Sequence, residues 1–161
     1  IRKMSHLVEK ADIITPNLTE ASILLGKKNC DEKITTPQIK EYLRELCALG
    51  PKTSVITGIE TDEGQHINVC YNKEEDRFWK APFVYVNKRY PGTGDLFTSL
   101  FLGYYMRGKS LPEAMEEASR FVSLAVIATY EAKTLSSEGV IFEKIMKELY
   151  NEIKEYKYSN M

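Results

Sequence analysis

The pattern of apolar and polar positions divides the chain into three zones, of which the first, residues 1–50, alternates helix and strand. The apolar run at residues 11–15 predicts a short buried strand that ends at Pro16, because the residue before a proline is pushed towards extended backbone. A helix is predicted from about residue 18 to residue 25, with Gly26 as its stop.

The clearest helical signal lies between Thr36 and Gly50. Thr36 is the predicted N-cap, Pro37 occupies the first helical position, and Gly50 stands just past the end. The apolar residues of this segment recur at helical spacing and predict one buried stripe, which consists of Ile39, Tyr42, Leu43, Leu46 and Leu49.

The second zone, residues 51–86, has the pattern of strands throughout. Residues 53–57 predict a buried strand, whereas residues 65–71 and 77–86 alternate more and are separated by a polar turn at 72–76. We therefore expect the last two strands to be antiparallel neighbours at an edge of the sheet.

The third zone is helical. One helix begins within residues 92–95 and ends before Gly108, and the next opens at Ser110, where Glu113 is placed to complete a capping box. A further helix over residues 137–150 precedes a polar, tyrosine-containing tail that we expect to fray. Together the three zones predict an α/β fold with one mixed sheet flanked by helices.

Composition and charge narrow the classes of function. The 161 residues are 43% hydrophobic and 28% charged, as in an ordinary globular domain. The 22 basic and 23 acidic residues give a net charge of −1, so we expect neither nucleic acid nor a membrane as a partner. No apolar run approaches the roughly 20 residues that a membrane span needs. Cys30, Cys47 and Cys70 lack metal-ligand spacing, which indicates reduced thiols in a cytoplasmic protein.

Candidate chemistry begins with Gly92-Thr93-Gly94-Asp95, directly before an apolar helix. Glycines bring backbone N–H groups close to a ligand, and a helix start adds unpaired donors and the positive end of the dipole. The segment therefore predicts a site for an anion, most naturally a phosphate. Asp95 could accept the proton of an attacking hydroxyl in phosphoryl transfer, or it could do no more than cap the helix.

A second polar set, Asn17 and Glu20, follows a strand and opens a helix. Locally the two residues fit a capping pair. They also stand at the carboxyl end of a strand, where α/β sheets bind ligands, and could hold water on Mg²⁺ or orient phosphates. Thr57 and Gly58 end another strand and could contact a nucleotide, although a plain strand-to-turn junction explains them as well.

Asn17-Leu18-Thr19-Glu20 and Gly92-Thr93-Gly94-Asp95, in this order, resemble the two signatures of the ribokinase-like superfamily. Residues 11–21, 92–103 and 108–114 look typical of its pyridoxal/pyridoxine/pyridoxamine kinase branch. The similarity runs through essentially the whole chain.

The resemblance implies a ribokinase-like fold and ATP-dependent phosphorylation of the 5′-hydroxymethyl group of pyridoxal, pyridoxine or pyridoxamine, with ATP as co-substrate and Mg²⁺ as the metal. It makes Asp95 the catalytic base and the loop of Gly92, Thr93 and Gly94 the anion hole. Glu20 would act on the metal through water. The implied ATP-binding residues are Thr15, Asn17, Glu20, Thr57, Ala81, Pro82, Phe83 and Val84.

The resemblance also implies a homodimer and leaves open whether a monovalent cation assists. Full members of the family are considerably longer at the N-terminus. We therefore expect residues 1–161 to be the C-terminal, nucleotide-binding portion of a single kinase domain, without the half that grips the substrate ring. Alone, this portion is expected to be a poor catalyst.

Other functions stay open. A hydroxymethylpyrimidine kinase of the same superfamily often carries a Lys-Gly-Gly-His run after the strand that here ends Ile56-Thr57-Gly58-Ile59, and the absence of that run argues against it. A sugar or nucleoside kinase fits residues 96–114 less well. A catalytically inactive nucleotide-binding fragment would need the glycines but would have no use for Asp95 as a base.

Overall fold

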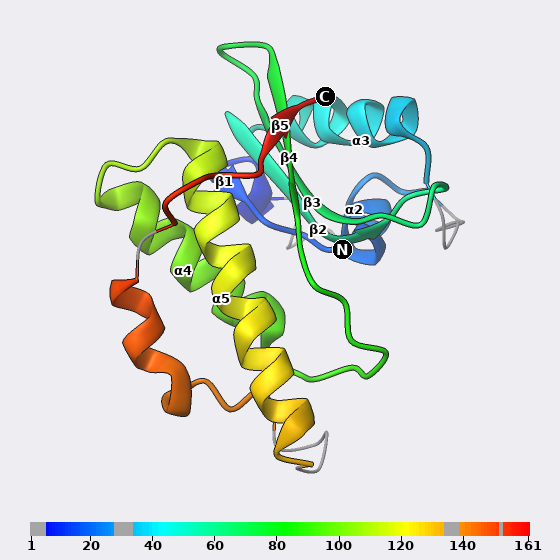
Figure 1. Ribbon diagram of the computed structural model, residues 1–161. Coiled ribbons are helices and arrows are strands. Elements are labelled where there is room, and N and C mark those ends of the chain that lie inside the picture. The colour runs from blue at the N-terminus through cyan, green and yellow to red at the C-terminus, as the bar shows by residue number, and fades with distance from the viewer. Residues whose placement is uncertain (1–5, 28–33, 134–138, 152) are drawn as a thin grey trace. The chain divides into compact units, whose positions relative to one another are not determined.

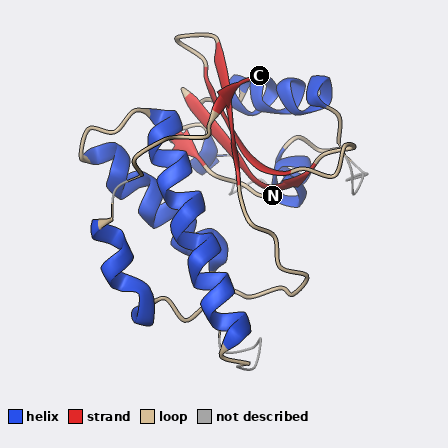
Figure 2. Ribbon diagram, in the orientation of Figure 1, coloured by secondary structure: helices blue, strands red, loops and turns tan. Residues whose placement is uncertain are grey.

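A computed structural model describes residues 6–27, 34–133, 139–151 and 153–161 (Figure 1). The chain divides into two compact units, one of Ile1–Ala81 with Ser159–Met161 and one of Pro82–Tyr158. Figure 2 shows that the strands gather in the first unit, whereas the second contains the two longest helices.

The first unit is built on a five-stranded sheet whose strands follow one another in sequence order. β1 runs parallel to β2, whereas β2 is antiparallel to β3 and β4 is antiparallel to β5, so the sheet is mixed, as predicted. The strands are β1 (Ile13–Ile14), β2 (Thr53–Glu60), β3 (His66–Asn72), β4 (Arg77–Pro82) and β5 (Ser159–Asn160).

Two helices of the first unit, α2 (Leu18–Leu24) and α3 (Thr36–Ala48), cover one face of this sheet (Figure 1). Side chains two positions apart on a strand share a face. Alternate residues of β3 accordingly enter the same buried cluster as the inner side of α3. The members from β3 are Ile67, Val69 and Tyr71, and those from α3 are Ile39, Leu43, Leu46 and Cys47.

Two details of α3 correct the prediction. The N-cap is Thr35 rather than Thr36, because the Thr35 N–H and hydroxyl both donate to Gln38 Oε1, at 2.9 and 2.7 Å. Leu49 is 38% exposed and lies outside the buried stripe, whereas Cys47 is fully buried within it. The stripe thus follows the 3.6-residue period only up to the helix end, where the backbone changes direction.

Two strand boundaries also differ from the prediction. β2 does not end at Thr57 but continues to Glu60 through an irregularity between Ile56 and Ile59. Gly58 lies within this irregularity with a φ of +71°, a conformation that favours glycine. The strand predicted over 77–86 ends at Pro82, which has no N–H to donate to a neighbouring strand.

The second unit contains α4 (Thr93–Met106), α5 (Leu111–Glu131) and the 3₁₀-helix η2 (Glu143–Tyr150). The capping box predicted at Ser110 and Glu113 is present, with the Ser110 N–H donating to Glu113 Oε2 at 2.8 Å. The α-helix predicted over residues 137–150 is a 3₁₀-helix from Glu143 onwards, and its first two positions lie outside the described residues.

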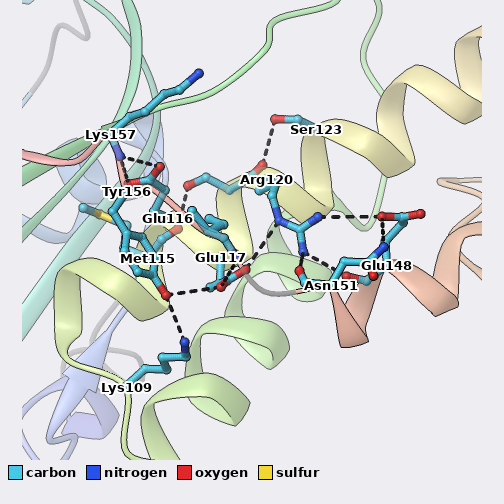
Figure 3. A network of polar contacts seen from close by, with 12 residues as sticks. Lys109, Met115, Glu116, Glu117, Arg120, Ser123, Glu148, Asn151, Tyr156 and Lys157 are labelled. Atoms are coloured by element: carbon cyan, nitrogen blue, oxygen red, sulfur yellow. Dashed lines mark hydrogen bonds and ion pairs between the residues drawn. The ribbon is translucent and has the colours of Figure 1, made fainter.

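Helix α5 is buried on most sides and carries two glutamates inside the second unit. Glu116 is 6% exposed and Glu117 is 1% exposed. Since a buried carboxylate is costly unless donors surround it, these side chains need partners. The chain after η2 supplies them (Figure 3).

Both carboxylates bind the C-terminal tail. The Lys157 N–H donates to both Glu116 oxygens at 2.8 Å, and the Tyr158 N–H donates to Glu116 Oε2 at 2.6 Å. Glu117 accepts from the Ile153 N–H at 3.2 Å and from the Tyr156 hydroxyl at 3.3 Å. The expectation that the tail frays is therefore wrong.

Arg120, one turn along α5, completes the network shown in Figure 3. Its Nε donates to Glu117 at 3.4 Å, and its Nη2 donates to the carbonyl oxygens of Glu148 and Asn151 at 2.9 and 2.8 Å. The guanidinium thus ties the end of η2 to the same helix that holds the tail.

Cys47 and Cys70 are buried free thiols, and burial raises the pKa of both. Cys30 lies outside the described residues. Within the described ranges, no helix combines the length and the apolar character that crossing a bilayer requires.

The substitution Glu116→Gln tests the anchoring of the tail. It replaces one acceptor oxygen by an NH₂ group that faces backbone donors, so we expect a loss of about 1–3 kcal/mol of unfolding free energy. Urea titrations measure this loss. In a separate experiment, amide hydrogen exchange at Lys157 and Tyr158 should be faster in the variant than in the wild type. Glu131→Gln, at an exposed position of α5, is the matched control. Unchanged exchange at Lys157 in Glu116→Gln would show that the carboxylate does not hold the tail.

Candidate anion-binding and nucleotide site

The start of α4 has the geometry that the glycine-rich segment predicts. Gly92 is the N-cap residue and has a φ of +85°, in the left-handed region that favours glycine. Its carbonyl accepts the first helical hydrogen bond, from the Leu96 N–H at 3.0 Å. The Thr93 hydroxyl donates to the Tyr90 carbonyl at 3.3 Å, a hydrogen bond that links the two ends of the turn before α4.

The first backbone N–H groups of α4 lack a hydrogen-bond acceptor in the described part of the chain. Among the residues that the structure describes, no acceptor is found for the backbone N–H of Thr93, Gly94 or Asp95, and no side chain caps the helix. Gly94 and Asp95 are exposed. Unpaired donors at the positive end of a helix form a ready site for an anion.

The three other α-helices whose starts are described show what is missing here. α2, α3 and α5 each begin with a complete capping box, in which the residue at the third helical position reaches back to the N-cap N–H. Those residues are Glu20, Gln38 and Glu113. Asp95 occupies the equivalent position of α4 and makes no such bond. Capping therefore does not account for Asp95.

The carboxylates of Glu113 and Asp95, at equivalent positions of α5 and α4, differ in their hydrogen bonds. The Ser110 hydroxyl and the Ser110 N–H both donate to Glu113, and these hydrogen bonds lower the pKa of its carboxyl group. The Asp95 carboxylate is exposed, and within the described ranges it has no hydrogen bond or ion pair. It is thus available to a ligand.

Lys88 and Arg89 precede the loop, and both are exposed. Sequence reasoning did not select them, although a pair of basic residues three and four positions before Gly92 was a visible signal. Their charge adds to the positive end of α4 in attracting an anion.

The second predicted set of residues lies in the first unit, where the chain leaves β1. Asn17 and Glu20 form the predicted capping box: the Asn17 N–H donates to Glu20 Oε2 and the Glu20 N–H donates to Asn17 Oδ1, both at 2.9 Å. Both side chains are exposed. The box uses the single side-chain oxygen of Asn17 and one of the two carboxylate oxygens of Glu20, so the other Glu20 oxygen lies outside it.

Thr57 is brought beside this capping box. An isolated parallel bridge pairs Asn17 with Thr57, and the Thr57 N–H donates to the Pro16 carbonyl at 3.0 Å. Thr15, Asn17, Glu20 and Thr57 are therefore gathered at the carboxyl end of the parallel pair β1 and β2, where α/β sheets bind ligands.

The segment Ala81–Val84 spans the boundary between the two units. Ala81 is fully buried at the end of β4, whereas Val84 is 55% exposed. The Val84 N–H donates to the hydroxyl of Ser123 on α5 at 3.2 Å. Ser123 was missed by sequence reasoning, and the only signal was a hydroxyl on the buried face of an apolar helix.

The predicted residues thus fall into two groups. Thr15, Asn17, Glu20, Thr57 and Ala81 belong to the first unit, and Pro82, Phe83, Val84 and the segment 92–95 belong to the second. Within the described ranges no three His, Cys, Asp or Glu side chains are arranged to hold a metal ion. A divalent cation at Glu20 would therefore need water and phosphate oxygens to complete its ligands.

The sequence is similar to those of known kinases. The family model for phosphomethylpyrimidine kinase matches residues 1–140. The hydroxymethylpyrimidine/phosphomethylpyrimidine kinase of Aquifex aeolicus is 30% identical over 122 residues, which are 76% of this chain and 46% of that protein. A pyridoxal kinase of Actinobacillus succinogenes is 31% identical over 127 residues, which are 76% of this chain and 42% of that protein.

A crystal structure from Bacteroides thetaiotaomicron, of a protein provisionally named a phosphomethylpyrimidine kinase and crystallised with pyridoxal, superposes with a TM-score of 0.92. It is 38% identical, and the match covers 99% of this chain and 56% of that one. The predicted ribokinase-like α/β fold is thereby confirmed. The chain spans about half the length of the relatives it matches.

Paired substitutions test whether Asp95 caps its helix. Asp95→Ala removes only the interaction of a charge with the helix dipole, so it should cost about 0.3–1 kcal/mol of unfolding free energy. Glu113→Ala at the equivalent position of α5 also removes a capping box and should cost about 1–2 kcal/mol. Urea titrations of both variants give the comparison. A greater cost for Asp95→Ala than for Glu113→Ala would restore capping as the role of Asp95.

Proposed function

Because the chain belongs to the phosphomethylpyrimidine kinase family, we propose that it is the nucleotide-binding portion of a kinase that transfers the γ-phosphoryl group of ATP to a hydroxymethyl group on a nitrogen heterocycle. The observation that carries this proposal is the uncapped start of α4, where the N–H groups of Thr93, Gly94 and Asp95 find no acceptor within the described residues.

In the proposed reaction, Gly92, Thr93 and Gly94 form the anion hole. Phosphoryl transfer places negative charge on the oxygens of the transferring group, and fixed N–H donors stabilise that charge without reorganising. Asp95 lies beside these donors, and its carboxylate forms no hydrogen bond or ion pair with any described residue. It would receive the proton of the attacking hydroxyl as the new P–O bond forms.

For the first unit we propose a role in binding phosphate and metal. Thr15, Asn17, Glu20 and Thr57 gather there, and Glu20 retains one carboxylate oxygen outside the capping box. Mg²⁺, when bound, neutralises phosphate charge, and Glu20 would hold it through water. Ala81, Pro82, Phe83 and Val84 would lie along the nucleotide.

Pyridoxal and its two related vitamers are the substrates we favour. The Bacteroides protein that was crystallised with pyridoxal is 38% identical, and this supports the assignment. Hydroxymethylpyrimidine is the second candidate, favoured by the family model and by the Aquifex relative at 30% identity. Both substrates present a hydroxymethyl group on a six-membered ring. Turnover of each by the whole enzyme separates the two.

The substitution Asp95→Asn tests the proposed function itself. The amide keeps the size of the side chain but cannot accept a proton, so turnover in the whole enzyme should fall by about 10²–10⁴-fold. ATP affinity, measured by calorimetry, should stay nearly unchanged because the backbone donors remain. Equal turnover in the variant would refute the assigned role, and a protein that binds ATP without any turnover would be a nucleotide-binding module.

The substitution Glu20→Gln separates metal binding from helix capping. Gln38 forms the capping box of α3, so a glutamine at position 20 should preserve the box of α2 and the stability of the protein. Loss of the negative charge should shift the Mg²⁺ dependence of turnover to higher concentration. Gln38→Glu, on a helix with no proposed role, is the control. An unshifted Mg²⁺ titration for Glu20→Gln would remove Glu20 from the metal site.

A further inference from the structure

A segment far along the chain lies against the loop that precedes the anion hole. Gly139 has a φ of +78°, and a Cβ atom at this position would lie 3.3 Å from the carbonyl oxygen of Pro91. That distance is tighter than ordinary van der Waals contact, so any side chain at residue 139 would push the loop. The absence of a side chain therefore lets the two backbones approach closely.

The contact falls on a peptide unit that matters for the site. The Pro91 carbonyl and the Gly92 N–H belong to one planar peptide, so displacement of the oxygen turns the N–H with it. Gly92 is the N-cap of α4, and its left-handed conformation sets the direction in which the following N–H groups point. A displacement of a few tenths of an ångström at Pro91 is thus passed to the donors of the anion hole.

Thr129 holds the neighbouring segment to α5. Its side chain is fully buried, its hydroxyl donates to the Ala125 carbonyl at 2.6 Å, and its oxygen accepts from the Ile141 N–H at 2.9 Å. Since the single hydroxyl proton is used on Ala125, the lone pairs are left to face Ile141. Ile141 is two residues from Gly139, so this bond limits how far Gly139 can retreat from Pro91.

We propose that Gly139 and Thr129 are positioning residues for the anion hole: Thr129 fixes residues 139–141 on α5, and Gly139 allows them to support the Pro91–Gly92 peptide. This inference rests on the proposed function of residues 92–94. Electrostatic stabilisation of a transferring group depends on donors that are already in place, and small displacements of such donors reduce the rate steeply. Neither residue touches the reacting atoms.

A matched pair of glycine substitutions tests the proposal in the whole enzyme. Gly108, at the other end of α4, also has a positive φ, of +92°, but a Cβ atom there would meet nothing within 4 Å. Gly139→Ala and Gly108→Ala both place a side chain at a positive φ and should lower the urea midpoint, Gly139→Ala somewhat more because of its contact with Pro91. Only Gly139→Ala should lower kcat, by about tenfold or more, while KM for ATP changes less than threefold.

A second pair reaches the same contact through α5. Thr129→Val keeps the shape of the side chain but loses the acceptor for the Ile141 N–H, so kcat should fall by about fivefold. Thr129→Ser keeps the hydroxyl and should restore kcat to within about twofold of the wild type. This pair decides the question if Gly139→Ala does not fold, which circular dichroism would reveal.

The outcomes separate this inference from the proposed function. If the wild-type enzyme turns over and kcat is equal in Gly139→Ala and Gly108→Ala, the positioning role is wrong and the kinase assignment stands. Equal kcat in Thr129→Val and Thr129→Ser would have the same meaning. No turnover in the wild-type enzyme would overturn both. A fall in kcat confined to Gly139→Ala and Thr129→Val is the expected result.

Discussion

Buried oxygen atoms on α5 accept hydrogen bonds from backbone N–H groups of segments that have no regular structure. Glu116 receives Lys157 and Tyr158, Ser123 receives Val84, and Thr129 receives Ile141. A buried acceptor without a donor is costly, and so is a buried N–H without an acceptor. Each hydrogen bond therefore pairs a buried oxygen of α5 and at the same time fixes an irregular segment of the second unit. The positions of these segments depend on such pairs.

The start of α4 differs from the described starts of the other α-helices in how its polar groups are paired. At the starts of α2, α3 and α5, the side chain at the third helical position accepts a hydrogen bond from the N-cap N–H. α4 begins instead at Gly92, a residue without a side chain, and its first N–H groups stay unpaired within the described residues. Folding alone would favour a cap here, since one stabilises a helix by about 1 kcal/mol. Unpaired donors beside an exposed carboxylate are what a phosphoryl-transfer site requires.

Local patterns in the sequence predicted the features whose causes are local. The capping pairs Asn17–Glu20 and Ser110–Glu113 and the helix start at residues 92–95 depend on residues three or four positions apart, and all three are present. The mixed α/β sheet was also predicted, because the succession of strand and helix patterns along the chain indicates this fold class even though the strand pairing itself is not local. The loss of Leu49 from the buried stripe and the 3₁₀ geometry from Glu143 onwards could not be read from the spacing of apolar residues.

Features that depend on distant partners were missed. The tail was expected to fray because its residues are polar, but its donors meet Glu116 across 41 residues of sequence. Gly139 and Pro91 likewise lie far apart along the chain and in contact in space. A glutamate on a helix or a glycine in a loop has the same local pattern whether or not such a partner exists, so only the structure distinguishes the two cases.

The most direct measurement of the central claim is a nuclear magnetic resonance titration of the ¹⁵N-labelled protein with Mg²⁺ and a non-hydrolysable ATP analogue. The account predicts that the amide resonances of Thr93, Gly94 and Asp95 shift together as the nucleotide binds, whereas those at the capped start of α5 do not. Saturable binding of the analogue with these three amides unmoved would contradict it.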